Sequence, residues 1–162
     1  MGNKTQENLA KAFVGESQAR NKYTYFASVA KKEGFEQISK IFQETADNER
    51  EHAKRIFKLL GEKNVEVQTL AMGGIGDTKA NLKHAAEGEK YEWGTMYPSF
   101  EKEAREEKET EAADFFREVA GVEAQHEKRY LKLLDNIISG KVFKRDRPMK
   151  WKCRNCGYVY EG

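Results

Sequence analysis

Two glutamate–histidine pairs stand where an amphipathic helix would carry apolar side chains. Glu49 and His52 form one pair, and Glu123 and His126 form the other. The spacing of three residues is close to one helical turn, so both side chains of a pair point into the same space. Carboxylates and imidazoles that converge on one face can bind a divalent metal such as iron or manganese.

The residues around each pair follow the rhythm of a helix that faces a packed interior, with alternating steps of three and four residues. The two stripes that carry the pairs comprise Ile38, Phe42, Thr45, Glu49, His52, Ile56 and Leu59, and Ala112, Phe116, Val119, Glu123, His126, Tyr130, Leu133 and Ile137. Two further stripes carry glutamates without histidines: Leu9, Phe13, Glu16, Arg20, Tyr23, Ala27 and Ala30, and Leu82, Ala85, Glu89, Glu92, Met96 and Phe100. Five glutamates and two histidines are therefore predicted near the middle of four apolar stripes.

The spacing between these glutamates indicates an internal repeat. Glu16 and Glu49 are 33 residues apart, and Glu89 and Glu123 are 34 residues apart. Glutamate is frequent in this chain, so two E-x-x-H pairs alone could arise by chance. Two single glutamates combined with two E-x-x-H pairs, however, are typical of di-iron and di-manganese carboxylate bundles. His84 has no glutamate three residues before it and lies off this level, so we expect an ordinary surface histidine.

Charge balance also favours bound metal over a metal-free helical scaffold. Arg20 is the only obvious cation on the four stripes. Five buried carboxylates would repel one another and would have to take up protons. Two divalent cations would nearly neutralise them. Oxygen ligands with two imidazoles suit iron or manganese better than a metal that prefers thiolates.

Four helical segments must position these residues. We predict helices over about residues 5–32, 36–60, 78–107 and 110–139, three of which are followed by Gly34, Gly61 and Gly140. The turns at Gly34 and near Lys108 are short, whereas the glycine-rich connection between the second and third helices is long. Two helical hairpins joined by one long crossover are typical of an all-α, ferritin-like four-helix bundle. We expect this bundle over residues 1–140, a linker over 141–149 and a metal knuckle over 150–162.

The composition excludes several other classes of protein. A net charge of +2 gives no reason to expect nucleic acid as a partner. The N-terminus lacks the apolar stretch of a signal peptide, and no apolar run is long enough to span a membrane, so we expect a soluble cytoplasmic protein. Both cysteines, Cys153 and Cys156, lie in one C-x-x-C motif. In a reducing compartment this motif favours metal or redox chemistry over a structural disulfide.

Nearly the whole chain resembles the rubrerythrin family, whose members are di-iron proteins of anaerobic and microaerophilic microbes. The segments that carry the resemblance are GESQARNKY, NEREH, GEKYEWGTMYP, VEAQHEKRYL and WKCRNCGYVYEG. The second glutamate of the third helix, Glu92, separates this pattern from ferritin-like storage proteins. The rival interpretation is a protein that oxidises and stores iron as a ferritin-like cage.

The resemblance implies a role for each residue of the cluster. Glu49 and Glu123 would bridge two irons, Glu16 would bind one of them, and Glu89 and His126 would bind the other. On reduction, one iron would exchange Glu92 for His52. Tyr23 and Tyr97 match tyrosines that lie just outside the ligands, although both would equally suit the core.

The implied activity is the two-electron reduction of hydrogen peroxide to water. The resemblance further implies a homodimer that receives electrons through a rubredoxin-type centre, from rubredoxin or an NAD(P)H-linked rubredoxin reductase-type donor. Family members hold one iron with two C-x-x-C knuckles. Cys153 and Cys156 supply only the first, so we expect either a shortened chain or further thiolates from another chain, and an iron there only if the site is completed.

Overall fold

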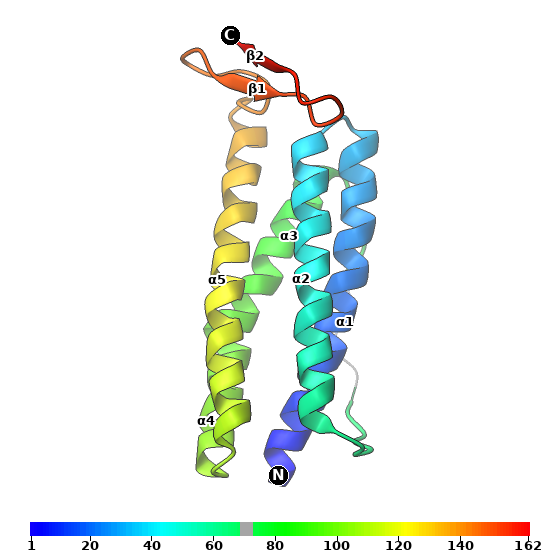
Figure 1. The fold of residues 1–162 in the computed structure, drawn as a ribbon, viewed down its shortest axis with the longest axis vertical. Helices are drawn as coiled ribbons and strands as arrows, with labels where there is room; N and C mark the ends of the chain where they lie inside the picture. Colours follow the sequence, from blue (N-terminus) through cyan, green and yellow to red (C-terminus); the bar gives the residue numbers. More distant parts are fainter. Residues whose placement is uncertain (69–72) are drawn as a thin grey trace.

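The computed structural model describes residues 1–68 and 73–162, which form a long helical bundle with a small strand pair at one end (Figure 1). The helices are α1 (Asn3–Lys32), α2 (Glu36–Leu60), α3 (Thr78–Tyr91), α4 (Tyr97–Glu106) and α5 (Thr110–Ile138). A π-helical turn, η1 (Glu92–Met96), joins α3 to α4, and the strands are β1 (Lys150–Lys152) and β2 (Val159–Glu161). The fold is the expected all-α four-helix bundle, with α3, η1 and α4 together forming its third rod.

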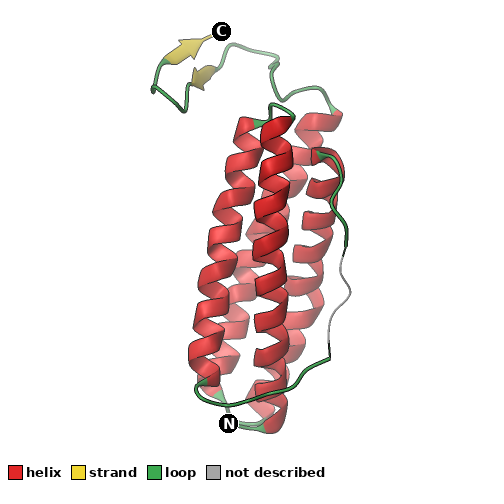
Figure 2. Ribbon diagram, turned by 90° about the vertical axis from the view of Figure 1, so that its right-hand side faces the viewer, coloured by secondary structure: helices red, strands yellow, loops and turns green. Residues whose placement is uncertain are grey.

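Short turns make α1 and α2, and α4 and α5, antiparallel neighbours. Gly34 and Gly61 adopt φ angles of 84° and 64°, and these positive values are cheap only without a β-carbon. Lys108 adopts a φ of 63° in the turn before α5, where the chain has no glycine. The described parts of the long connection between α2 and α3 lie along one flank of the bundle (Figure 2). This crossover is the one that the unequal loop lengths predict.

The third rod is not the continuous α-helix that the sequence predicted over residues 78–107. At η1 one turn accommodates an additional residue, and single π-helical turns of this kind occur often at functional sites. Met96, the last residue of the π turn, and Tyr97, the first residue of α4, are both buried, although they are adjacent in sequence. The Nε1 atom of Trp93 donates a hydrogen bond to Glu127 over 2.7 Å, which ties this turn to α5.

Two apolar clusters fill the bundle, one toward each end. The first combines the early part of α1 and the end of α2 with α4 and the start of α5, and includes Leu9, Ile56, Tyr97 and Phe116. The second combines the end of α1 and the start of α2 with α3 and the end of α5, and includes Phe26, Phe42, Leu82 and Tyr130. The glutamates and histidines fall between these clusters along each helix, so apolar packing screens them from water on two sides.

The C-terminal segment carries the two cysteines at the end of the bundle where α1 meets α2 (Figure 1). β1 and β2 pair antiparallel, with Trp151 opposite Tyr160. Between them, the backbone N–H of Cys153 donates to the carbonyl of Tyr158 over 2.7 Å, and that of Gly157 donates to the carbonyl of Cys153 over 2.9 Å. None of the helices within residues 1–68 and 73–162 has the length and apolar character needed to cross a membrane.

Candidate metal centre

Six of the seven predicted ligands converge at one level of the bundle. They form two groups of four, each with ligand atoms within 4.8 Å of one another. One group comprises Glu16, Glu49, His52 and Glu123, and the other comprises Glu49, Glu89, Glu123 and His126. Because Glu49 and Glu123 belong to both groups, their two-oxygen carboxylates can reach two neighbouring metal ions at once.

His52 faces the first group through Nδ1. This atom lies 3.0 Å from Oε2 of Glu49 and 3.1 Å from Oε1 of Glu123. It lies 3.4 Å from Oε2 of Glu16, which approaches from α1. The His52 side chain is 14% exposed, whereas the glutamates around it are almost completely buried. His52 is therefore the most solvent-accessible of the six converging residues.

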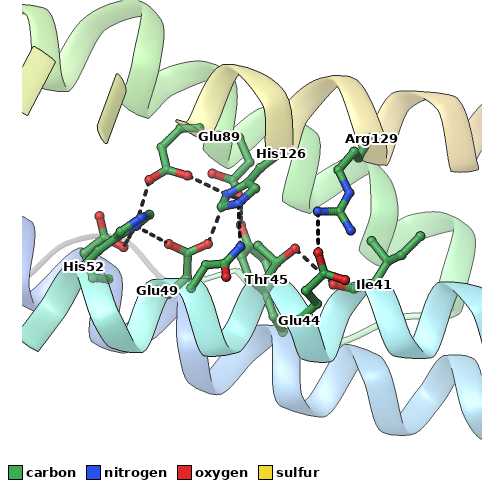
Figure 3. Close-up of polar contacts among 12 residues, drawn as sticks. Ile41, Glu44, Thr45, Glu49, His52, Glu89, His126 and Arg129 are labelled. Atoms are coloured by element: carbon green, nitrogen blue, oxygen red, sulfur yellow. Dashed lines mark hydrogen bonds and ion pairs between the residues drawn. The ribbon is translucent and has the colours of Figure 1, made fainter. Parts of the chain in front are cut away.

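His126 faces the second group, also through Nδ1 (Figure 3). This atom lies 2.6 Å from Oε2 of Glu123 and 3.3 Å from Oε1 of Glu49. Oε1 of Glu89 is 3.8 Å away. The other ring nitrogen, Nε2, lies 3.2 Å from the side-chain amide of Asn48 on α2. The sequence did not point to Asn48, because the helical stripe passes through its neighbour Glu49 and not through Asn48 itself.

Both predicted tyrosines contact the cluster from outside it. The hydroxyl of Tyr23 donates a hydrogen bond to Oε1 of Glu89 over 2.7 Å, and the hydroxyl of Tyr97 donates one to Oε1 of Glu16. Each of the two glutamates outside the E-x-x-H pairs thus accepts a hydrogen bond from a tyrosine. The third buried tyrosine in this region, Tyr130, has a hydroxyl with no hydrogen-bond partner among the described residues.

Two residues expected at the cluster do not join it: Arg20 is exposed, and Glu92 lies outside both groups of four. Arg20, expected among the carboxylates, is exposed and does not neutralise them, because α1 turns it out of the interior. Glu92 belongs to neither group of four. Burial raises the pKa of Glu92, and the charges of Glu16, Glu123 and Glu49 raise it further, so its carboxyl group still lies in their field. His84 is exposed, as expected.

The unpaired atoms of the cluster match the requirements of metal ions. Several buried atoms have no hydrogen-bond partner within the described part of the chain: Glu16 Oε2, Glu49 Oε1, Glu89 Oε2, both carboxylate oxygens of Glu123 and Nδ1 of His126. Unpaired buried polar groups are costly and rare in folded proteins. All of these atoms belong to the two groups of four, so two metal ions would satisfy them together.

Without metal, burial and the neighbouring charges shift the pKa values of the residues in this cluster. Burial raises the pKa of Glu16, and it raises the pKa of Glu89, to which the charges of Glu92, Glu123 and Glu49 add. Burial also acts on Glu49, but the adjacent imidazoles of His126 and His52 outweigh it and lower the pKa to about 2. Burial disfavours the charged form of His126, yet the close carboxylates of Glu123 and Glu49 raise the pKa to about 9. Burial also disfavours the charged form of His52, but the carboxylates of Glu123, Glu16 and Glu49 raise its pKa, so the carboxylates favour the cationic form of both imidazoles.

Comparison with known proteins identifies the family to which the chain belongs. The family model described as rubrerythrin matches residues 7–134, which include all seven predicted ligands in the bundle. The chain belongs to the rubrerythrin family. Rubrerythrins are di-iron proteins of oxidative-stress defence, and the two groups of four correspond to a site for two iron ions.

Individual rubrerythrins extend this match over nearly the whole chain. Rubrerythrin-1 of Clostridium acetobutylicum is 53% identical over 167 residues, covering 99% of this chain and 85% of that protein. Rubrerythrin of Nitratidesulfovibrio vulgaris is 54% identical over 162 residues, with the same two coverages. A structure of nigerythrin in a mixed-valence state has a TM-score of 0.77 and 33% identity, covering all of this chain and 78% of nigerythrin. An open-pore ferritin from Archaeoglobus fulgidus, at 18% identity and a TM-score of 0.71, shares the fold alone.

Proposed function

We propose that this rubrerythrin-family protein reduces hydrogen peroxide to water. The observation that carries the proposal is the pair of four-residue groups joined by Glu49 and Glu123, with Glu92 as an additional carboxylate three residues after Glu89. When bound, two ferrous ions supply one electron each, so the O–O bond is cleaved with two electrons and no hydroxyl radical is released. Two protons complete the formation of two water molecules.

The protein's own residues hold this site and control protons around it. Glu49 and Glu123 would bridge the ions, Glu16 would bind one of them, and Glu89 and His126 would bind the other. Tyr23 and Tyr97 hold protons at their hydroxyl oxygens and direct them to Glu89 and Glu16. The apolar clusters on either side exclude water and keep the carboxylates in place.

We also propose that His52 and Glu92 alternate as ligands to one ion. In this structure the ring of His52 faces three carboxylates, while Glu92 stays outside both groups. That arrangement corresponds to the one that the family resemblance implies for the reduced site. In the oxidised site, Glu92 would replace His52 and bring an additional negative charge to the more highly charged metal pair.

Electrons would reach the site through a rubredoxin-type centre and an NAD(P)H-linked redox partner such as rubredoxin or a rubredoxin reductase-type donor. Backbone hydrogen bonds from Cys156 and Asn155 lower the pKa of the Cys153 thiol, which favours the thiolate that binds metal. Two further thiolates would complete an iron site there. We also propose that the protein is cytoplasmic and that it forms a homodimer. Analytical ultracentrifugation would test the homodimer.

Peroxide consumption by the reduced, iron-loaded protein tests the main proposal. We expect one peroxide to oxidise two ferrous ions in each chain, without any further iron being taken up. The Glu123→Ala variant, which removes a carboxylate shared by both groups, should lose this reaction. A reduced protein that leaves peroxide unchanged would contradict the proposal. Uptake of many irons per chain in the presence of oxygen would instead favour the ferritin-like storage function.

A further inference from the structure

Asn48 makes a contact that distinguishes the two histidines of the cluster. It lies on α2, next to Glu49, and its side-chain amide is 3.2 Å from Nε2 of His126 on α5. The opposite ring nitrogen, Nδ1, lies among the carboxylates of the second group. The imidazole of His126 is therefore held at both nitrogens, one facing the metal position and one facing Asn48.

His52 lacks the corresponding outer contact. Its Nδ1 faces Glu16, Glu49 and Glu123. Within residues 1–68 and 73–162, no protein group forms a hydrogen bond with its Nε2. The His52 side chain is 14% exposed, against 3% for His126. One histidine is thus fixed in orientation and the other is held only by the atoms of the cluster itself.

We propose that Asn48 is the positioning residue for His126 and that this contact keeps His126 bound while His52 is free to leave. A metal-binding imidazole usually donates its second N–H to an acceptor that fixes the ring and its tautomer. With a metal on Nδ1, Nε2 carries the proton, and a half-turn of the Asn48 amide, whose Nδ2 lies 3.2 Å from Nε2, places the amide oxygen to accept the hydrogen bond. This inference deepens the proposed function and depends on the same metal site.

An amide suits this position better than a carboxylate would. The oxygen and nitrogen of an asparagine side chain exchange places on a half-turn of the amide. Asn48 can therefore accept from a protonated Nε2, both when metal occupies Nδ1 and when the ring is cationic without metal, and it can donate to Nε2 in the neutral tautomer that lacks this proton. It also adds no negative charge beside the five glutamates.

A neighbouring contact supplies a matched control. Glu44, on the same helix as Asn48, pairs with Arg129 on α5, and Oε1 of Glu44 lies 2.9 Å from Nη1 of Arg129 (Figure 3). Glu44 precedes Asn48 by one helical turn, and Arg129 follows His126 by three residues. The Glu44→Ala variant therefore removes a tie between the same two helices without touching the imidazole of His126.

Nuclear magnetic resonance of zinc-loaded protein with ¹⁵N-labelled histidine tests the inference without relying on enzyme activity. In the unaltered protein, we expect Nε2–H of His126 to exchange with solvent at least about tenfold more slowly than that of His52, because among the described residues only His126 has an acceptor. Asn48→Ala should remove this difference and weaken zinc binding about 10- to 100-fold in a chelator competition. Asn48→Asp, which can only accept, should keep the slow exchange.

Each outcome bears on the inference. Equal exchange rates for the two histidines in the unaltered protein would overturn it, as would slow exchange that persists in Asn48→Ala. An effect of Glu44→Ala as large as that of Asn48→Ala would show that helix packing, rather than the imidazole contact, is responsible. Zinc that binds the unaltered protein without contacting His126 would overturn the metal site and the inference together, whereas the earlier outcomes leave the metal site intact.

Discussion

The hydroxyl of Tyr23 lies 2.7 Å from Oε1 of Glu89 and donates a hydrogen bond to it in the interior of the bundle. Tyr23→Phe should therefore leave one oxygen of Glu89 without its partner. We expect peroxide turnover to fall about 10-fold or more, as for other residues that orient metal ligands. The metal-free protein should lose about 1–3 kcal/mol of unfolding free energy, the usual cost of leaving a buried polar group without its hydrogen-bond partner. Steady-state kinetics and chemical denaturation would measure the two effects.

Tyr130 provides the control for this substitution. Its ring packs 5.5 Å from that of Tyr23, but its hydroxyl has no hydrogen-bond partner among the described residues. Tyr130→Phe removes only that unpaired hydroxyl, so it should leave stability unchanged or slightly higher and turnover nearly intact. Equal losses in the two variants would mean that aromatic packing, and not the hydrogen bond to Glu89, determines the effect.

The next prediction concerns the number of metal ions that each chain binds. Because Glu49 and Glu123 complete two groups of four, iron-loaded protein should contain two ions per chain in the bundle. At most a partial third ion should bind at Cys153 and Cys156. Elemental analysis of protein expressed anaerobically with iron would check this number. A folded helical protein without bound metal would contradict the site assignment.

Removing the metal should make stability depend on pH in a defined direction. The pKa values of Glu16, Glu89 and Glu92 are raised, mainly by burial, so the folded metal-free protein binds more protons than the unfolded chain above about pH 4.5. The pKa of His126 is raised to about 9 by its carboxylate partners, which acts in the same direction above about pH 6.5. The lowered pKa of Glu49, about 2, has the opposite sign but acts only below pH 4.5.

The metal-free protein should therefore become less stable as pH rises from 5 to 8, and mild acidification should partly restore it. Bound metal should raise the melting temperature at neutral pH and remove most of this dependence, because the carboxylates then bind cations instead of protons. Differential scanning calorimetry across this pH range, with and without chelator, would measure both effects. A melting temperature that rises with pH in the metal-free protein would contradict the prediction.

The proposed ligand exchange predicts different defects for two single variants. His52→Ala should leave the oxidised spectrum nearly unchanged but weaken ferrous binding and slow peroxide turnover. Glu92→Ala should instead alter the oxidised spectrum and slow the return to the resting state. The reason is that a ligand bound in one state can shift only an equilibrium that involves that state. Absorption spectra and stopped-flow peroxide decay would separate the two, and identical defects would show that both residues bind throughout.

Several features of the site could be predicted from the sequence because they depend on helical periodicity. The three- and four-residue steps indicated which residues of α2 and α5 face the interior, and the structure buries Glu49, Glu123 and His126. Glycines at the helix ends and one long connection were sufficient to predict the bundle with its single crossover. These signals are local, since each depends on residues within one or two helical turns.

Periodicity was less reliable where the helix departs from 3.6 residues per turn. The π turn at Glu92–Met96 shifts later side chains around the rod by roughly 100° for one additional residue. Tyr97 thereby becomes fully buried and reaches Glu16, while Phe100, expected on the stripe, is only partly buried. A regular pattern can continue through an irregular turn without revealing it.

The sequence by itself determined the ligand types, their faces and the repeat that places one glutamate and one E-x-x-H pair in each hairpin. Only the tertiary structure decided which oxygens meet: Glu49 and Glu123 belong to both groups, while Glu92 belongs to neither. It alone joined Asn48 to His126 across two helices that are far apart in sequence. The physical reason is that periodicity fixes the direction of a side chain on its own helix, whereas distances between helices depend on how their cores pack together.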